Sequence, residues 1–519
     1  MFKDYRVVFL RKIRLWVILG LFVSGLITHT GISFGQQSSW TQPVLMGRGW
    51  FPTIAADLTG RVHLAWAGTM TIVQGTNTTG EEYTGYDVVM YSFTEDGLNW
   101  EGNYDIMARL QTAGSEVTRP SFFADSQGIL HMTFRDRKVF YSHSPAPLAS
   151  IARSWSLPYL LSADQVSYFS DIKMDSQGVL HMVYTENVLT SSCPICFRIY
   201  YRQSVDNGNN WSIRSEISNI PTGSAKPQLL IDTEDNIHLV WEAGRGGATG
   251  QLSDPTTVMY SASMDGGNTW RRALEFAVPD GRSKNITIGL DGRGNLVVAW
   301  LALPDDLIYY QVSSNGGRTW SNPEPIPNVF GGWEAYTARL DSYHMAADSA
   351  GHLHLVAVGR TSEMDESLHV LRVTWNGANW SRPEVVASLR GDVPEWPRIA
   401  ISNGNILNVT WFVRDEAHIF DSDQGEYYVW YSRGRSSAPD VESMIVPTSV
   451  PTLAPTAGMV IPTQTSEPPD PALALTPIAS DLSSTIYSEI DEMKTIATSL
   501  IPAALVVLLV VAIIRFRRS

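Results

Sequence analysis

Cysteine is nearly absent from this chain. Its 519 residues contain 2 cysteines, Cys193 and Cys196, which lie together in a Cys-Pro-Ile-Cys stretch. A structural zinc site needs more ligands than this pair supplies, and no second pair exists. A redox-active pair is expected beside a strand–helix unit, which the surrounding sequence lacks. In an exported protein, we expect the pair to form a local disulfide.

Basic residues are outnumbered by acidic ones. The chain has 38 lysines and arginines against 52 aspartates and glutamates, which gives a formal net charge of −14. Nucleic-acid binding requires clustered Lys and Arg that contact phosphates. The charge balance therefore excludes nucleic acid as a partner, and the 10% aromatic content indicates a globular protein.

Both ends of the chain carry export and membrane signals. Residues 1–14 are basic and precede an apolar run from Leu15 to Ile27, which is short for a membrane span and predicts a cleaved signal peptide, with an uncleaved anchor as the alternative. A charge-free run near the other end is followed by Arg515, Arg517 and Arg518, which favours a single span with a cytoplasmic C-terminus. We expect a single-pass cell-membrane protein whose main domain is extracellular. The expected segments are a signal peptide (1–37), a folded domain (38–435), a Pro/Thr/Ser-rich stalk (436–480), a juxtamembrane segment (481–495), a transmembrane helix (496–514) and a cytoplasmic tail (515–519).

A strand–turn–strand phrase repeats along the folded domain. It is clearest at Lys226–Ala243, KPQLLIDTEDNIHLVWEA, and its copies are spaced 50 to 68 residues apart. Strand-type alternation with such a period predicts a ring of small sheets, a β-propeller. The turn position of the seven copies is occupied by Asp57, Asp125, Asp175, Asp232, Asp291, Asp348 and Ser402.

A second phrase, a hairpin leading to a tryptophan, follows most copies of the first. Trp40 precedes the first copy, and the last copy has no tryptophan strand after it. We therefore predict an all-β, seven-bladed β-propeller of four-stranded antiparallel blades, in which the N-terminal strand completes the last blade and removes an open edge. The other marker tryptophans are Trp100, Trp155, Trp211, Trp270, Trp320 and Trp380.

The hairpin phrase carries a family resemblance. SVDNGNNW, SMDGGNTW and SSNGGRTW, which end at Trp211, Trp270 and Trp320, resemble the Asp-box of the bacterial neuraminidase repeat. This resemblance implies the sialidase-like superfamily, in which the box lies away from the active site. Physically, these residues hold a turn.

The histidines follow the repeat as well. Five of the 11 histidines lie six residues after a turn aspartate, each in a different repeat. A catalytic or metal-binding histidine should occur once or in a cluster, so we interpret these as structural. They are His63, His131, His181, His238 and His354.

Candidate ligand-binding residues lie at the start of each inner strand. Six residues before the turn position the copies differ, and two residues further on they differ again, on the same side of the strand. Variation around one face of the ring predicts a ligand site there, while a solvated rim with structural pairs is the alternative. The ligand-binding candidates are Arg119, Lys226, Asn285, His344, Trp396 and Arg398.

Two functions are compatible with these residues. The first is a binding or adhesion propeller, monomeric, whose ligand is a glycan or a cell-surface protein. The second, implied by the resemblance, is exo-sialidase-type glycoside hydrolysis, with Asp171 as acid/base and Glu334 and Tyr336 as the glutamate–tyrosine pair. No cofactor is expected. The acidic stretch from Arg414 to Glu426 could bind calcium, although it lacks an EF-hand spacing.

Overall fold

The computed structural model describes most of residues 39–444 and neither end of the chain. The described residues are 39–70, 75–76, 82–83, 86–110, 117–163, 165–190, 193–220, 222–246, 252–276, 281–332, 340–389, 392–415 and 427–444. The expected signal peptide and transmembrane helix lie outside them. Within these ranges, no helix is both long and apolar enough to cross a bilayer.

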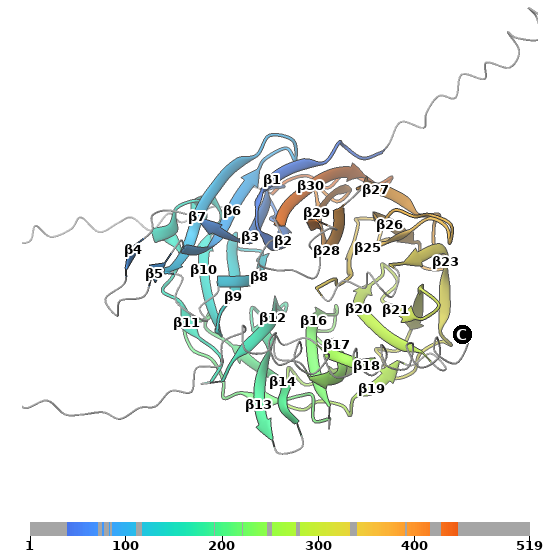
Figure 1. The fold of residues 1–519 in the computed structure, drawn as a ribbon, viewed down its shortest axis with the longest axis horizontal. Coiled ribbons are helices and arrows are strands. Elements are labelled where there is room, and N and C mark those ends of the chain that lie inside the picture. The colour runs from blue at the N-terminus through green and yellow to red at the C-terminus, as the bar shows by residue number, and fades with distance from the viewer. Residues whose placement is uncertain are drawn as a thin grey trace, which may run out of the picture. The chain divides into compact units, whose positions relative to one another are not determined.

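Five separate four-stranded antiparallel sheets make up most of the ring (Figure 1). In each of these sheets the innermost strand pairs with the next strand along the chain. A short pair, β4 (Gly75–Thr76) and β5 (Glu82–Tyr83), and two 3-10 turns, η1 (Ala146–Leu148) and η2 (Ala152–Ser154), lie outside the sheets. The sheets are β2 (Trp50–Ala56), β3 (Val62–Met70), β6 (Tyr86–Thr94) and β7 (Glu101–Leu110); β8 (Val117–Ala124), β9 (Ile129–Asp136), β10 (Lys138–Pro145) and β11 (Tyr159–Leu160); β12 (Ser167–Met174), β13 (Leu180–Thr190), β14 (Cys193–Ser204) and β15 (Ser215–Glu216); β16 (Gly223–Ile231), β17 (Ile237–Gly246), β18 (Leu252–Ser263) and β19 (Leu274–Phe276); and β28 (Asp392–Ser402), β29 (Ile406–Asp415), β30 (Tyr427–Arg435) and β1 (Val44–Arg48).

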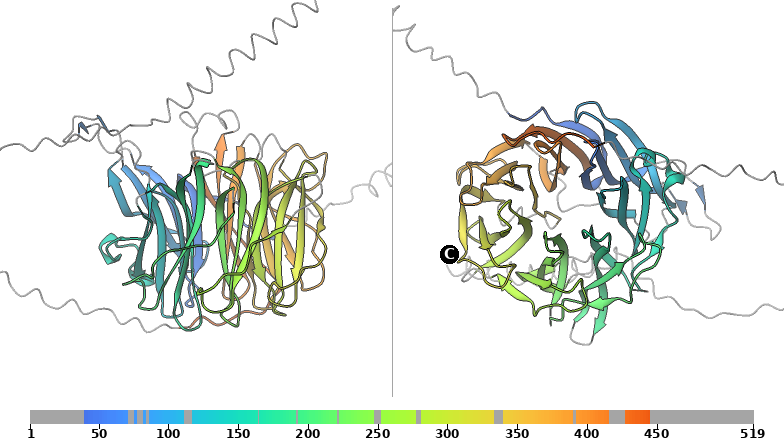
Figure 2. Two further views of the ribbon diagram at one scale, coloured as in Figure 1. Left: turned by 90° about the horizontal axis from the view of Figure 1, so that it is seen from below. Right: turned by 180° about the vertical axis from the view of Figure 1, so that it is seen from behind.

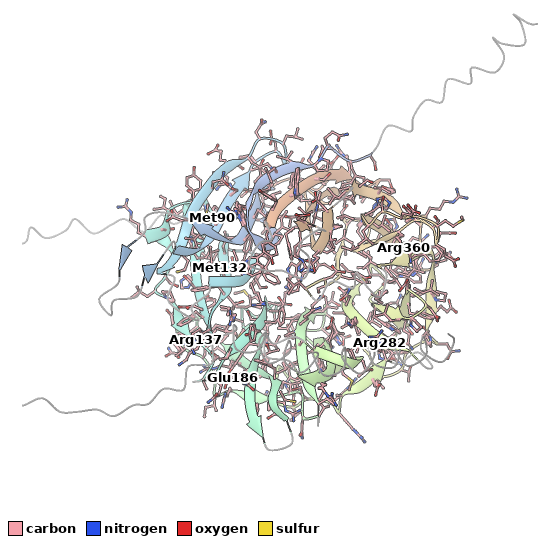
Figure 3. The ribbon with its side chains drawn as sticks, viewed as in Figure 1. Met90, Met132, Arg137, Glu186, Arg282 and Arg360 are labelled. Atoms are coloured by element: carbon pink, nitrogen blue, oxygen red, sulfur yellow. The ribbon has the colours of Figure 1, made fainter. Side chains whose placement is uncertain are left out.

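The remaining eight strands form one sheet, which corrects the prediction of seven separate blades. Its two halves are joined where Phe330 pairs with Arg360 and Gly331 pairs with Gly359. The join needs glycine, because a Cβ atom at Gly359 would lie 2.2 Å from the carbonyl oxygen of Phe330. Arg360, labelled in Figure 3, also donates from Nε to the carbonyl of Gly331 at 3.2 Å. The strands are β20 (Arg282–Leu290), β21 (Leu296–Leu303), β22 (Leu307–Ser313), β23 (Glu324–Gly331), β24 (His344–Ala347), β25 (Leu353–Arg360), β26 (His369–Trp375) and β27 (Glu384–Ser388).

The ring is closed by its N-terminal strand, as predicted. Strand β1 pairs with β30, with Val44 opposite Tyr431 and Arg48 opposite Tyr428. Figure 1 shows these two strands side by side, although they come from opposite ends of the folded domain. Trp40 is 5% exposed and packs into the core of this last sheet. The prediction of an all-β propeller closed in this way is confirmed.

The innermost strands meet around the ring axis. Strands β2, β8, β12, β16, β20, β24 and β28 contact one another in this order, and β28 contacts β2. In the side view of Figure 2 the strands run along the axis, so each sheet has one end on each face of the ring. The innermost strands end at the turn aspartates, and we call the face on which these turns lie the turn face. Residues 436–444 bind there too, since Val441 N–H donates to Asn403 and Met444 N–H donates to Leu58.

The repeated histidines hold the sheets together. In the sheet of β17, His238 lies between the turn carboxylate of Asp232 (Nε2–Oδ2, 3.1 Å) and the hydroxyl of Tyr260 (Nδ1–Oη, 2.8 Å). Burial lowers the pKa of His238, so its imidazole is neutral at physiological pH. His63, His131 and His181 make the same two contacts, and His354 keeps the one to its aspartate. The structural role predicted for these histidines is confirmed.

The cysteine pair lies at the hairpin that joins β13 and β14. Cys196 is buried and disulfide-bonded, as the sequence led us to expect. Val188 on the neighbouring strand pairs directly with it. The bond therefore reinforces the end of this hairpin.

Candidate functional site

Six of the innermost strands carry the same irregularity. In each of them, the pairing register with the neighbouring strand shifts at the candidate position six residues before the turn position. On β28, for example, the shift lies between Glu395 and Arg398. An extra residue in one strand bends it and redirects a side chain. A positive φ, which is uncommon outside glycine, recurs at this place in five strands. The residues are Phe51 (49°), Arg119 (53°), Lys226 (50°), Asn285 (56°) and Trp396 (57°).

These side chains form a closed layer across the ring, which we call the bulge layer. Four of the ligand-binding candidates belong to this layer, namely Arg119, Lys226, Asn285 and Trp396, and every member of the layer is at most 9% exposed. Side chains that the bulges turn towards the axis meet there and bury one another. The layer consists of Phe51, Arg119, Phe169, Lys226, Asn285, Ser342 and Trp396.

One half of the bulge layer is aromatic. Trp396 meets Phe51 edge-to-face with ring centroids 5.2 Å apart, and it stacks on Phe169 at 5.9 Å. The guanidinium of Arg119 lies 4.6 Å from the ring centroid of Phe51 and 4.9 Å from that of Phe169. Such cation–π contacts contribute about 1–2 kcal/mol each when they are desolvated. Arg119 and Trp396 thus stabilise the layer.

Asp341 organises the other half of the bulge layer. It directly precedes Ser342, a member of the layer, in the chain. Its carboxylate accepts the N–H of Trp396 (3.1 Å) and the side-chain amide of Asn285 (2.9 Å), and its carbonyl accepts Lys226 Nζ (2.6 Å). Lys226 also pairs with Glu242 at 3.2 Å. Burial raises the pKa of Asp341 to about 6, although Lys226 opposes the rise. The ligand-binding role of Lys226 and Asn285 stays a prediction, but both already hold buried carboxylates.

A cavity of about 290 Å³ lies under the bulge layer. We call the positions two residues further along the innermost strands the cavity layer, and all but Thr287 line the cavity. The varied side chains at these equivalent positions of the repeats thus lie together around one cavity. Arg119, Lys226 and Trp396 also reach the cavity from the bulge layer. The lining members of the cavity layer are Thr53, Ser121, Asp171, Gln228, His344 and Arg398.

The cavity opens towards the turn face, opposite to the face on which the sequence placed the ligand site. Along β8, Arg119 is buried, whereas Ser121 and Phe123 are partly exposed. Along β16, Lys226 is buried and Gln228 is partly exposed. The lining continues to Ala56, Ala124 and Ile401, each next to a turn position. The bulge layer closes the other end.

Asp171, predicted as the acid/base, joins three innermost strands. Its Oδ1 accepts the hydroxyl of Ser121 (3.0 Å), its own strand's Ile172 N–H (2.9 Å) and Lys173 Nζ (3.2 Å). Its Oδ2 accepts the N–H of Leu229 at 2.8 Å. The acid/base role stays a prediction, and these four hydrogen bonds hold the carboxylate in place. Asp171 is thus placed as a bridge between β8, β12 and β16.

Arg398 brings an incompletely used guanidinium to the cavity. Its Nη1 donates to the carbonyls of Ser342 (3.2 Å) and Pro397 (2.9 Å), and its Cζ lies 3.9 Å from the ring centroid of Trp396. Burial lowers its pKa to about 9, although Asp171 and Asp341 oppose this, so it remains charged at neutral pH. Within the described part of the chain, its Nε and Nη2 have no acceptor and it forms no ion pair.

His344 and Lys173 add donors to the same cavity. His344 Nδ1 accepts the N–H of Ile399 at 3.3 Å, and burial, assisted by Arg398 and Lys173, lowers its pKa well below the ordinary value. The neutral ring therefore carries its hydrogen on Nε2, for which the described residues offer no acceptor. Lys173 is 35% exposed and pairs with Asp171. Among the described lining residues, Arg398 and His344 thus bring unused donors to the cavity.

Several predicted residues lie outside the described ranges. Glu334 and Tyr336 belong to residues 333–339, and the possible calcium stretch is described only at Arg414 and Asp415. Arg414 forms an ion pair with the buried Glu395, whose pKa burial raises to about 7.

The sequence reasoning missed two residues of the site. Asp341 lies directly before the bulge-layer position Ser342, and an acid next to such a position was the available signal. Lys173 continues the two-residue period from Asp171, so one more step along the strand would have found it.

The chain matches no protein-family model and no curated protein. A protein of unknown function from Dyadobacter fermentans has 14% identity and a TM-score of 0.42, over 76% of this chain and 100% of that one. A polysaccharide lyase of family PL25, an ulvan lyase, has 11% identity and a TM-score of 0.47, over 71% and 93%. The NanB sialidase from Streptococcus pneumoniae has 12% identity and a TM-score of 0.41, over 76% and 70%. The structural neighbours thus include propeller enzymes, but TM-scores below 0.5 carry no inference about the function of this chain.

Proposed function

We propose that this protein is a binding propeller that holds an anionic glycan in the central cavity. The observation that carries the proposal is the guanidinium of Arg398, which stays charged in the cavity with two nitrogen atoms for which the described residues provide no acceptor. A partly buried guanidinium with unused donors favours a carboxylate or sulfate group. Lys173 and the Nε2–H of His344 add to the attraction.

The rest of the cavity suits a sugar. The hydroxyls of Thr53 and Ser121 and the amide of Gln228 line it beside the aromatic bulge layer. A volume of 290 Å³ lies near the lower end of the range for ligand pockets, about 300 Å³, which is enough for one ring and its substituents. One acidic monosaccharide unit, free or at the end of a chain, is therefore the best match.

Hydrolysis of the exo-sialidase type is the alternative. It would use Asp171, Glu334 and Tyr336, and Asp171 does line the cavity. The four donors around its carboxylate come from three strands, which favours a structural role for Asp171 over the acid/base role.

The same proposal places the propeller outside the cell. We propose that residues 496–514 anchor the chain as a single span, and that it works as a monomer facing glycans or glycoproteins. We also propose that β20–β23 and β24–β27 act as two blades joined at Gly331 and Gly359, so that seven four-stranded units surround the cavity. The join involves only two residue pairs, while each half keeps four strands.

A glycan array that displays acidic and neutral sugars, probed with the full-length protein, tests the proposal. We expect binding confined to glycans that carry a carboxylate or a sulfate. A parallel assay with a fluorogenic sialoside should give no turnover. Equal binding of neutral glycans would contradict the assignment of Arg398, and steady turnover would favour the hydrolase.

A further inference from the structure

Asp341 and Arg398 are held close together without a hydrogen bond between them. Asp341 accepts the backbone N–H of Trp396, and the ring of Trp396 carries the guanidinium of Arg398 at 3.9 Å. Arg398 donates instead to the carbonyl of Ser342, the residue after Asp341. Asp171 and Asp341 therefore both compensate the positive charge of Arg398 through space, and Asp341 leaves its donors unused.

In the described part of the chain, Lys226 and Glu395, two charged groups near Asp341, are already paired. From β16, Lys226 reaches the carbonyl of Asp341 and pairs with Glu242 of β17. From β28, Glu395 pairs with Arg414 of β29; burial raises the pKa of Glu395 to about 7, and the charge of Asp341 adds to this rise. Among the described residues, the remaining neighbours are uncharged at neutral pH: Asn285 of β20, Tyr343, whose pKa burial raises, and His344, whose pKa burial lowers.

We propose that the carboxylate of Asp341 balances the charge of Arg398 and becomes protonated when an anion binds. Each anion that enters the cavity then binds together with one proton, which the carboxyl group of Asp341 takes up. This inference rests on the proposed function and adds its regulation. The proton comes from solvent, and no bond other than the O–H bond on Asp341 forms.

The physical basis is competition between two negative charges for one desolvated cation. Burial raises the pKa of Asp341 to about 6, and an anion beside Arg398 would raise it further, because like charges repel strongly where water is excluded. The coupling is reciprocal, so protonation of Asp341 strengthens anion binding by the same factor. Affinity should therefore rise as the pH falls from about 7.5 towards 6, by at most about tenfold per pH unit, and then level off.

Titration calorimetry on the full-length protein with sulfate tests this coupling. Sulfate keeps its charge between pH 5 and 8, so the probe itself does not titrate. Runs at pH 7 in buffers of different ionisation enthalpy give the number of protons taken up per anion, and we expect a value approaching one. Asp341→Asn, which removes the charge and nearly keeps the shape, should bind sulfate at pH 7.5 as tightly as the unaltered protein does at pH 5.5, with no proton uptake.

Glu395→Gln is the matched control, since it removes the other buried acid with a raised pKa. It should keep the proton uptake. Binding of sulfate by the unaltered protein with no proton uptake and no pH dependence would overturn the inference, even if Asp341→Asn fails to fold. Uptake lost in Glu395→Gln and kept in Asp341→Asn would overturn it too. Absence of binding by sulfate and by every acidic glycan at either pH would instead overturn the proposed function itself.

Discussion

The hydroxyl of Tyr260 occupies the place where a side chain at Gly317 would have to lie. A Cβ atom at Gly317 would be 1.8 Å from Tyr260 Oη, so the hairpin of one sheet closes directly on the tyrosine of the sheet before it. Tyr260 in turn contacts His238, which contacts the turn aspartate Asp232. The contact between these two neighbouring sheets therefore requires a glycine at position 317.

Gly317→Ala should destabilise the ring more than Gly316→Ala does. Both glycines have a positive φ, 71° and 65°, but nothing lies within 4 Å of a Cβ at Gly316. Backbone strain of about 1 kcal/mol is expected for both, and only Gly317→Ala adds a clash of about 1–3 kcal/mol. Urea unfolding of the two variants measures the difference. Equal losses would show that the Tyr260 contact is unimportant.

The buried histidines should make the fold sensitive to acid. Burial lowers the pKa of His63, His181, His238 and His354 below the ordinary value of 6.5. Their contribution to stability is therefore complete above pH 6.5 and is lost as the pH falls below it, by up to about 1.4 kcal/mol per pH unit for each group.

His238→Asn isolates one of these groups. Asn408 occupies the equivalent place in the last sheet and accepts the hydroxyl of Tyr431 at 2.7 Å, so asparagine can replace the contact to Tyr260. The variant should lose less stability than the unaltered protein between pH 6.5 and 5, measured by urea unfolding. Parallel curves for His238→Asn and the unaltered protein would contradict this account.

Removal of residues 38–49 should destabilise the ring. The deletion takes away β1 and Trp40, and with them a ladder of backbone hydrogen bonds to β30, each worth about 1 kcal/mol net. Fragments 38–444 and 50–444 should therefore differ clearly in melting temperature. The same melting temperature for both would mean that the last sheet does not need its outer strand.

Access from the turn face can be tested by obstruction. Ala124 lines the cavity at its turn end and is partly exposed, so Ala124→Trp should slow association of an acidic ligand severalfold. Ala347→Trp is the control, because Ala347 lies at the turn end of β24, is exposed and does not line the cavity. Stopped-flow binding gives both rates. An unchanged rate for Ala124→Trp would indicate a different entrance.

The repeats made most of the fold predictable. Alternation and the turn aspartates located the innermost strands, and the misplaced Trp40 predicted the closure by β1. The bulges were not predictable, because an extra residue does not interrupt an apolar pattern that is buried on both sides. These bulges place Arg119 and Trp396 in the closed bulge layer.

The site was predictable only where it follows the repeat. Arg398 and His344 lie at equivalent positions, so alignment found them. Asp341 comes from an insertion without a counterpart in the other repeats, and its contacts to β16, β20 and β28 join strands far apart in the sequence. The join between Gly331 and Gly359 was missed because it departs from the repeat.

The central claim is that Arg398 serves a ligand, whereas the hairpin residues serve the fold. Asp265 accepts the N–H and hydroxyl of Thr269 in an exposed hairpin, and Arg318 is exposed on another. The decisive measurement is the affinity of an acidic glycan, with the melting temperature, for Arg398→Met, Asp265→Ala and Arg318→Met. We predict that Arg398→Met stays folded and loses affinity by at least about tenfold, about 1.4 kcal/mol, that Asp265→Ala melts earlier with unchanged affinity, and that Arg318→Met changes neither. Unchanged affinity in Arg398→Met, together with lost affinity in folded Asp265→Ala, would contradict this division.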